Sequence, residues 1–156
     1  MSVADRTVGK VFAKRAETEI YKLKKVSREF QVPYLAGYSK DRRTLYIDCD
    51  SLQGFKDKGT FVDTDKYLCI HEYVEDSCED NGASYNLGHA CATLAELGAV
   101  ADDGVDVDAY NYFMDQEVRK AGARKSYTNL PKNLDLLPYI SAPENRSLLK
   151  RMGLVL

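Results

Sequence analysis

The sequence predicts an α+β fold that is mostly helical, with a small antiparallel sheet, in a single domain covering residues 1–156. Three observations support this prediction. A length of 156 residues suits one hydrophobic core. Apolar residues recur at helical spacing in several long segments, and two short runs of β-prone side chains occur within residues 34–49. We therefore expect a helical domain that contains one hairpin.

The first expected helix covers residues 3–30, where apolar side chains are spaced among charges. Its apolar positions are Val8, Val11, Phe12, Ile20, Leu23 and Val26. The helix must end before Pro33, because a proline pushes the preceding residue out of helical geometry. Residues 34–49 then form the expected hairpin, with a polar turn around Lys40 and Asp41.

Gly54 and Gly59 mark an expected loop. Two adjacent helices are expected after it, at residues 65–80 and 84–100, joined by a tight corner. The residues that favour these boundaries are Asp63 or Thr64, Asn81, Gly82 and Ser84. A fourth helix is expected at residues 107–121, with Asp106 as its cap. Residues 122–156 should be rich in loops because three prolines interrupt them, with a last short helix at residues 144–152.

Charge is distributed unevenly along the chain. The total is 22 basic and 24 acidic side chains, so no global excess favours binding to nucleic acid or to an anionic membrane. Residues 59–118 nevertheless carry 14 acidic side chains and one base, Lys66, whereas both flanking segments are net basic. These carboxylates require cations, which come either from the flanks or from a bound metal ion.

The sequence also predicts the cellular location of the protein. We find no apolar run of the ~20 residues that a membrane span needs, and the first residues lack the apolar segment of a signal peptide. The four cysteines form no C-x-x-C pair and are expected to be reduced. The predicted location is the cytoplasm.

Both histidines of the chain fall in the acid-rich helical pair. His71 begins the motif H-E-Y-V-E, so His71 and Glu75 share one helix face, with Glu72 between them. In H-E-x-x-H metallopeptidases, the paired histidines hold zinc and the glutamate is the general base. Glu75 here takes the second ligand position, and a carboxylate oxygen is an accepted zinc ligand.

The next helix brings His89 onto one stripe with Glu96, two turns later, and with Tyr85. If this stripe faces His71 and Glu75, then His71, Glu75 and His89 become metal ligands. Glu96 is then a further ligand or an acceptor that orients a histidine. Two histidines and one carboxylate with an open position form a catalytic zinc set. The competing interpretation makes both histidines structural, pairs Glu75 with a lysine and leaves Glu96 in solvent.

The segments V-P-Y-L-A-G-Y-S-K-D-R-R-T-L-Y-I-D, I-H-E-Y-V-E-D and Y-N-L-G-H-A-C-A-T-L-A-E together resemble small bacterial and phage-associated zincin-like proteins. The resemblance covers about the central half of the chain and implies a single zincin-like domain with a zincin-like helix pair. It implies that His71 and Glu75 are the paired ligands, Glu72 the general base, and His89 or Glu96 the ligand from the second helix. The second histidine of ordinary zincins is missing.

The predicted function is that of a zinc-dependent hydrolase resembling metallopeptidases. Zinc or another divalent metal is its cofactor, a peptide or protein is its substrate, and Tyr85 steadies the developing oxyanion. One alternative is a noncatalytic, metal-stabilised accessory protein related to phages. Another is a metal-free interaction module, in which the basic first helix docks on an acidic partner or on the acidic middle segment of its own chain. A carboxylate-bridged two-metal oxidase ranks last, because its E-x-x-H pairs are missing.

Overall fold

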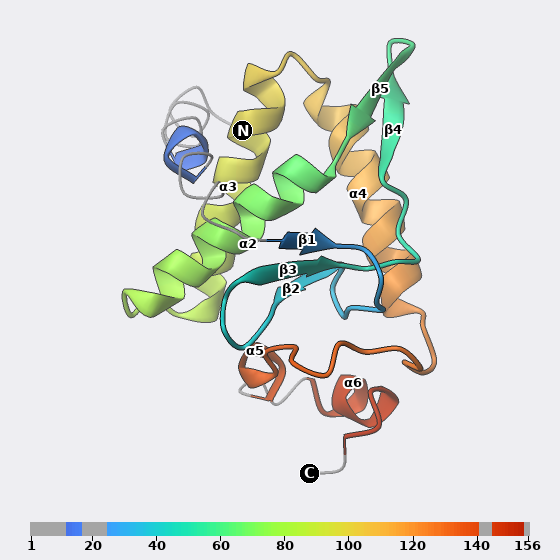
Figure 1. Cartoon of the computed structure of the whole chain (residues 1–156). Helices are drawn as coiled ribbons and strands as arrows, with labels where there is room; N and C mark the ends of the chain where they lie inside the picture. The colour runs from blue at the N-terminus through green and yellow to red at the C-terminus, as the bar shows by residue number, and fades with distance from the viewer. Residues whose placement is uncertain (1–11, 17–24, 141–144, 155–156) are drawn as a thin grey trace. The chain divides into compact units, whose positions relative to one another are not determined.

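The computed structural model describes residues 12–16, 25–140 and 145–154, and its fold is α+β, as predicted (Figure 1). The chain divides into two compact units, each built from two segments. Unit 1 contains Met1–Lys22 and Gln53–Met114, and unit 2 contains Leu23–Leu52 and Asp115–Leu156. Helix α4 runs from one unit into the other, so neither unit is a separate stretch of chain. The single domain expected over the whole chain stays a prediction.

Unit 1 is built on a helical hairpin of α2 (Asp65–Asp80) and α3 (Tyr85–Asp102), which lie side by side (Figure 1). The bounds predicted for α2, residues 65–80, are confirmed. Helix α3 extends two residues past its predicted end at residue 100. The corner between them depends on Gly82, whose φ of +87° favours glycine. The Ser84 side chain accepts a hydrogen bond from the backbone N–H of Leu87, which confirms it as the cap of α3.

Small residues allow these two helices to approach closely. A Cβ at Gly88 would lie 3.3 Å from the carbonyl oxygen of Glu75. The alanines of α3 pack against the apolar face of α2 and, with the start of α4 (Val107–Gly122), form the core of unit 1. Core members from these three helices are Ile70, Val74, Ala92, Ala95, Ala99, Val100 and Tyr110. Asp106 Oδ1 accepts from the N–H groups of Asp108 and Ala109, so the predicted cap of α4 is confirmed.

Unit 1 also contains a two-stranded hairpin where we expected a loop marked by Gly54 and Gly59. Strands β4 (Gly54–Asp57) and β5 (Thr60–Asp63) pair antiparallel. Lys58 and Gly59 both have positive φ, as the two central residues of a type I′ turn require. The loop prediction was wrong because a lysine at the first turn position hides the turn signal that asparagine or aspartate would give.

Unit 2 contains a three-stranded sheet in the order β1-β3-β2. Strands β2 (Ala36–Tyr38) and β3 (Thr44–Ile47) form the predicted antiparallel hairpin. Strand β1 (Lys25–Ser27) pairs parallel to β3, so the sheet is mixed and the end of the predicted helix 3–30 is wrong. Backbone pairing with β3 overrides the local helical pattern there. Residues 12–16 of that prediction are helical, and the rest up to residue 24 lies outside the described residues.

The C-terminal segment covers the sheet of unit 2. Its loops contain α5 (Leu137–Ile140) and α6 (Arg146–Arg151), the second of which corresponds to the short helix predicted at residues 144–152. Apolar side chains from both helices pack with those around the sheet, namely Val32, Tyr46, Leu134, Tyr139, Leu148, Leu149 and Met152. Among the helices described, none has the length and apolar character needed to cross a bilayer.

Candidate metal centre

Three predicted ligands converge between α2 and α3. His71 and Glu75 lie one turn apart on α2, and His89 projects from the first part of α3. The Nε2 atom of His71 lies 3.3 Å from Glu75 Oε2 and 3.2 Å from His89 Nδ1. The distance between His89 Nδ1 and Glu75 Oε2 is 2.7 Å. The structure therefore brings together the three side chains that the sequence selected as metal ligands.

Two of the three separations between these atoms are close to those around a tetrahedral metal ion. Ligand atoms at about 2.0–2.2 Å from zinc lie roughly 3.3–3.6 Å from one another. The two separations that involve His71 are close to this range, and the third has the length of a hydrogen bond. Two imidazole nitrogens and one carboxylate oxygen form an accepted zinc donor set that leaves a fourth position open. His89 is half-exposed, with 51% of its side-chain surface accessible, so solvent reaches this cluster.

Glu96 holds the imidazole of His71 in place. The Nδ1–H group of His71 donates to Glu96 Oε2 at 2.7 Å, and the hydroxyl of Tyr110 donates to Glu96 Oε1. Of the two roles that we predicted for Glu96, this geometry matches the acceptor that orients a histidine. Tyr110 was not among the predicted site residues, because its place on the apolar face of a helix gives it no signal in the sequence.

Without a metal ion, the cluster forms a charged hydrogen-bond network. Burial lowers the pKa of His71, but its hydrogen bonds with Glu75 and Glu96 outweigh burial and raise this pKa to about 10. Burial raises the pKa of Glu75, but hydrogen bonds with His71 and His89 lower it to about 2. The metal-free network thus pairs an imidazolium with carboxylates, and a bound cation would take the place of the proton on His71 Nε2.

Glu72, the predicted general base, follows His71 directly on α2 and is partly buried. Burial raises its pKa to about 7, His71 opposes this effect, and the carboxylates of Glu75 and Glu96 add to it. A carboxyl group with a pKa near neutrality exchanges protons readily at the pH of the cell. The role of Glu72 as general base stays a prediction.

Tyr85 lies on the solvent side of the cluster. Its ring stacks on that of His89, with centroids 5.7 Å apart and an interplanar angle of 21°. About half of its surface is exposed. The ring thus limits the rotation of His89, while its role toward an oxyanion stays a prediction.

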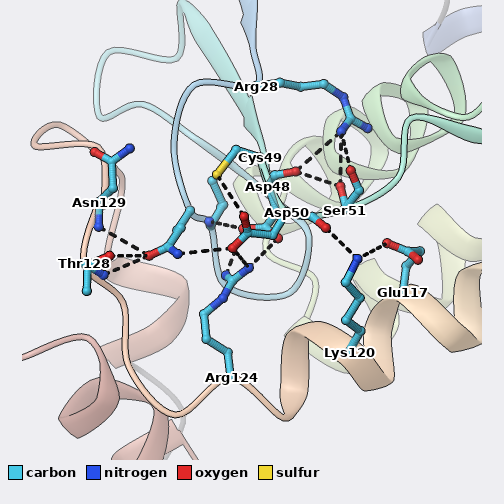
Figure 2. Close-up of polar contacts among 12 residues, drawn as sticks. Arg28, Asp48, Cys49, Asp50, Ser51, Glu117, Lys120, Arg124, Thr128 and Asn129 are labelled. Atoms are coloured by element: carbon cyan, nitrogen blue, oxygen red, sulfur yellow. Dashed lines mark hydrogen bonds and ion pairs between the residues drawn. The ribbon is translucent and has the colours of Figure 1, made fainter.

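A second group of possible ligands, Asp48, Cys49 and Asp50, lies in unit 2 and was not singled out in the sequence. Figure 2 shows that the guanidinium of Arg124 points into it. Arg124 donates to both oxygens of Asp48, at 2.8 and 2.7 Å, and to Asp50 at 2.9 Å. Asp48 also accepts from the backbone N–H of Val32. Arg124 already neutralises these carboxylates, so this group forms an ion pair around the buried Asp48 and offers no open site for a metal ion.

Comparisons with protein-family models, with curated proteins and with solved structures found no match. The resemblance to zincin-like proteins therefore stays a prediction. The functional argument rests on the geometry of the cluster around His71.

Proposed function

We propose that this protein is a zinc-dependent hydrolase whose metal ligands are His71, Glu75 and His89. The observation that carries the proposal is the approach of three ligand atoms from two helices to within 2.7–3.3 Å of one another. The hydrogen bond from His71 to Glu96 adds support, because histidines that bind metals usually donate their other ring N–H to a carboxylate or a carbonyl.

A zinc ion bound there would polarise a carbonyl group and lower the pKa of its water to about 7. Glu72, next to the ligand His71, would take the proton from the attacking water and pass it to the leaving amine. Tyr85 would border the reacting carbonyl at the exposed edge of His89. Peptide bonds are the proposed substrate class. All four cysteines are free thiols, in keeping with the reducing cytoplasm that we propose as the location.

A noncatalytic role is the second candidate. An ion held by ligands from both α2 and α3 would brace the helical hairpin, as structural zinc does. The exposure of His89 favours the catalytic proposal, because a structural site is closed by a fourth protein ligand.

Metal binding is tested first. Protein stripped with a chelator is titrated with zinc, cobalt and manganese, and bound metal is counted by elemental analysis. We expect one zinc per chain in the wild type and at least tenfold weaker binding in Glu75→Gln. Glu79→Gln is the matched control, because it makes the same change one turn further along α2. No zinc in the folded wild type, or equal affinity in the two variants, would overturn the site.

Catalysis is tested separately, with zinc-loaded protein and a library of fluorogenic peptides. We expect Glu72→Gln to retain zinc and to lose hydrolysis at least a hundredfold. Unchanged turnover in this variant would exclude Glu72 as the base. Stoichiometric zinc without hydrolysis in the wild type would favour the bracing role.

A further inference from the structure

We infer that Tyr110 is a positioning residue of the metal centre, which acts on the ligand His71 through Glu96. The inference rests on the proposed metal site and extends it to a third helix. Its basis is a continuous chain of hydrogen bonds that begins at Tyr110 in the core and ends at Nδ1 of His71, the ring nitrogen opposite the proposed ligand atom. His71 lies on α2, Glu96 on α3 and Tyr110 in the first turn of α4.

Glu96 is fixed at both of its oxygens. Oε2 accepts from His71 Nδ1–H at 2.7 Å, and Oε1 accepts from the Tyr110 hydroxyl. Only 7% of the Glu96 surface is exposed, so solvent contributes little to its hydrogen bonding. A buried carboxylate that loses one of two donors turns or attracts a proton, because an unsatisfied charged oxygen is costly away from water. Either response weakens the hold of Glu96 on His71.

Tyr110 is suited to this role because it is itself immobilised. Its exposed fraction is 1%, the ring of Tyr67 packs edge-on at 5.4 Å, and that of Phe55 packs at 6.3 Å. Burial and the neighbouring Glu96 raise the pKa of Tyr110 well above its usual value. The hydroxyl therefore keeps its proton and stays a donor.

The hydrogen bond to Glu96 determines which ring nitrogen of His71 carries hydrogen. With Nδ1–H held by Glu96, the lone pair is on Nε2, and Nε2 is the atom that lies near Glu75 and His89. His89 presents its Nδ1 to the same cluster, so its hydrogen belongs on Nε2. The two histidines of the metal-loaded protein should thus have opposite tautomers, and Tyr110 should secure that of His71.

The test compares Tyr110→Phe with Tyr67→Phe in the zinc-loaded full chain. Each variant removes one buried hydroxyl from two rings in contact, but the hydroxyl of Tyr67 donates to Asp103 at 2.7 Å and not to the site. Zinc affinity is measured by competition with a chelator, and ligand geometry by the visible spectrum of the cobalt-loaded protein. We expect about tenfold weaker zinc binding and an altered cobalt spectrum for Tyr110→Phe. Tyr67→Phe should stay within twofold of the wild type.

A second measurement does not depend on how a variant folds. Nitrogen-15 NMR of the zinc-loaded wild type reports the tautomer of each imidazole, and the chain has only two histidines to assign. We expect Nδ1–H on His71 and Nε2–H on His89. If the wild type binds zinc but Tyr110→Phe matches it in affinity and spectrum, or if His71 has the other tautomer, this inference fails and the proposed metal site stands. If the wild type binds no metal, the proposed function itself fails.

Discussion

Replacing Arg124 by methionine should destabilise the protein strongly, because it leaves the Asp48 carboxylate buried without its cation (Figure 2). The exposed fractions of the Asp48 and Arg124 side chains are 2% and 12%. The substitution removes two hydrogen bonds to Asp48 and one to Asp50, and it leaves Asp48 with the N–H of Val32. Loss of one partner from a buried pair costs about 3–5 kcal/mol.

Urea unfolding followed by circular dichroism measures this loss as a decrease in the free energy of unfolding. Lys120→Met is the comparison variant, because Lys120 lies on α4 shortly before Arg124, and its ion pair with Glu117 is long, at 3.8 Å, and half-exposed at the lysine. Its ammonium also donates to the backbone carbonyl of Asp50 at 2.7 Å, but it does not pair with the buried Asp48 carboxylate. We expect the control to cost at most about 1 kcal/mol. The double variant Asp48→Asn with Arg124→Met should recover part of the loss, since no unpaired charge remains. Equal effects of Arg124→Met and Lys120→Met would refute this reasoning.

Three further predictions concern the metal centre. Gly88→Ala should weaken zinc binding several-fold, measured by chelator competition, because its methyl group would lie 3.3 Å from the Glu75 carbonyl oxygen and push α3 away from α2; unchanged affinity would contradict this. The metal-free protein should lose stability to urea as pH rises from about 6.5 to 10, because the raised pKa of His71 stabilises the fold only while the ring is protonated. It should also lose stability as pH falls from about 4.5 to 2, because the lowered pKa of Glu75 stabilises the fold only while the carboxyl group is ionised. Greater stability at pH 9 than at pH 6 would contradict the assignment to His71, and greater stability at pH 2 than at pH 4.5 would contradict the assignment to Glu75. Zinc at a hundred times its dissociation constant should add about 2.7 kcal/mol to the free energy of unfolding, and a chelator should reverse the gain.

The approach of His71, Glu75 and His89 was predictable because these residues lie within local helical patterns. His71 and Glu75 share a face of one helix through their spacing of four residues. The end of that helix and the start of the next follow from Gly82 and Ser84 in the corner between them. The nearness of His89 follows from the tight corner between α2 and α3, which forces the two helices to run back along each other. These are short-range relations, and a sequence contains them directly.

The sequence by itself determined the α+β class, the long helices and the approach of His71, Glu75 and His89, the three proposed ligands, across the helical hairpin. Only the tertiary structure decided that Lys25–Ser27 forms a strand, that Tyr110 holds Glu96, and that Arg124 neutralises Asp48. The physical reason is the same in each case. A strand needs a partner for its backbone groups, and a buried charge needs an opposite charge or a donor. Those partners lie between 14 and 76 residues away in the sequence, where only the folded chain brings them into contact.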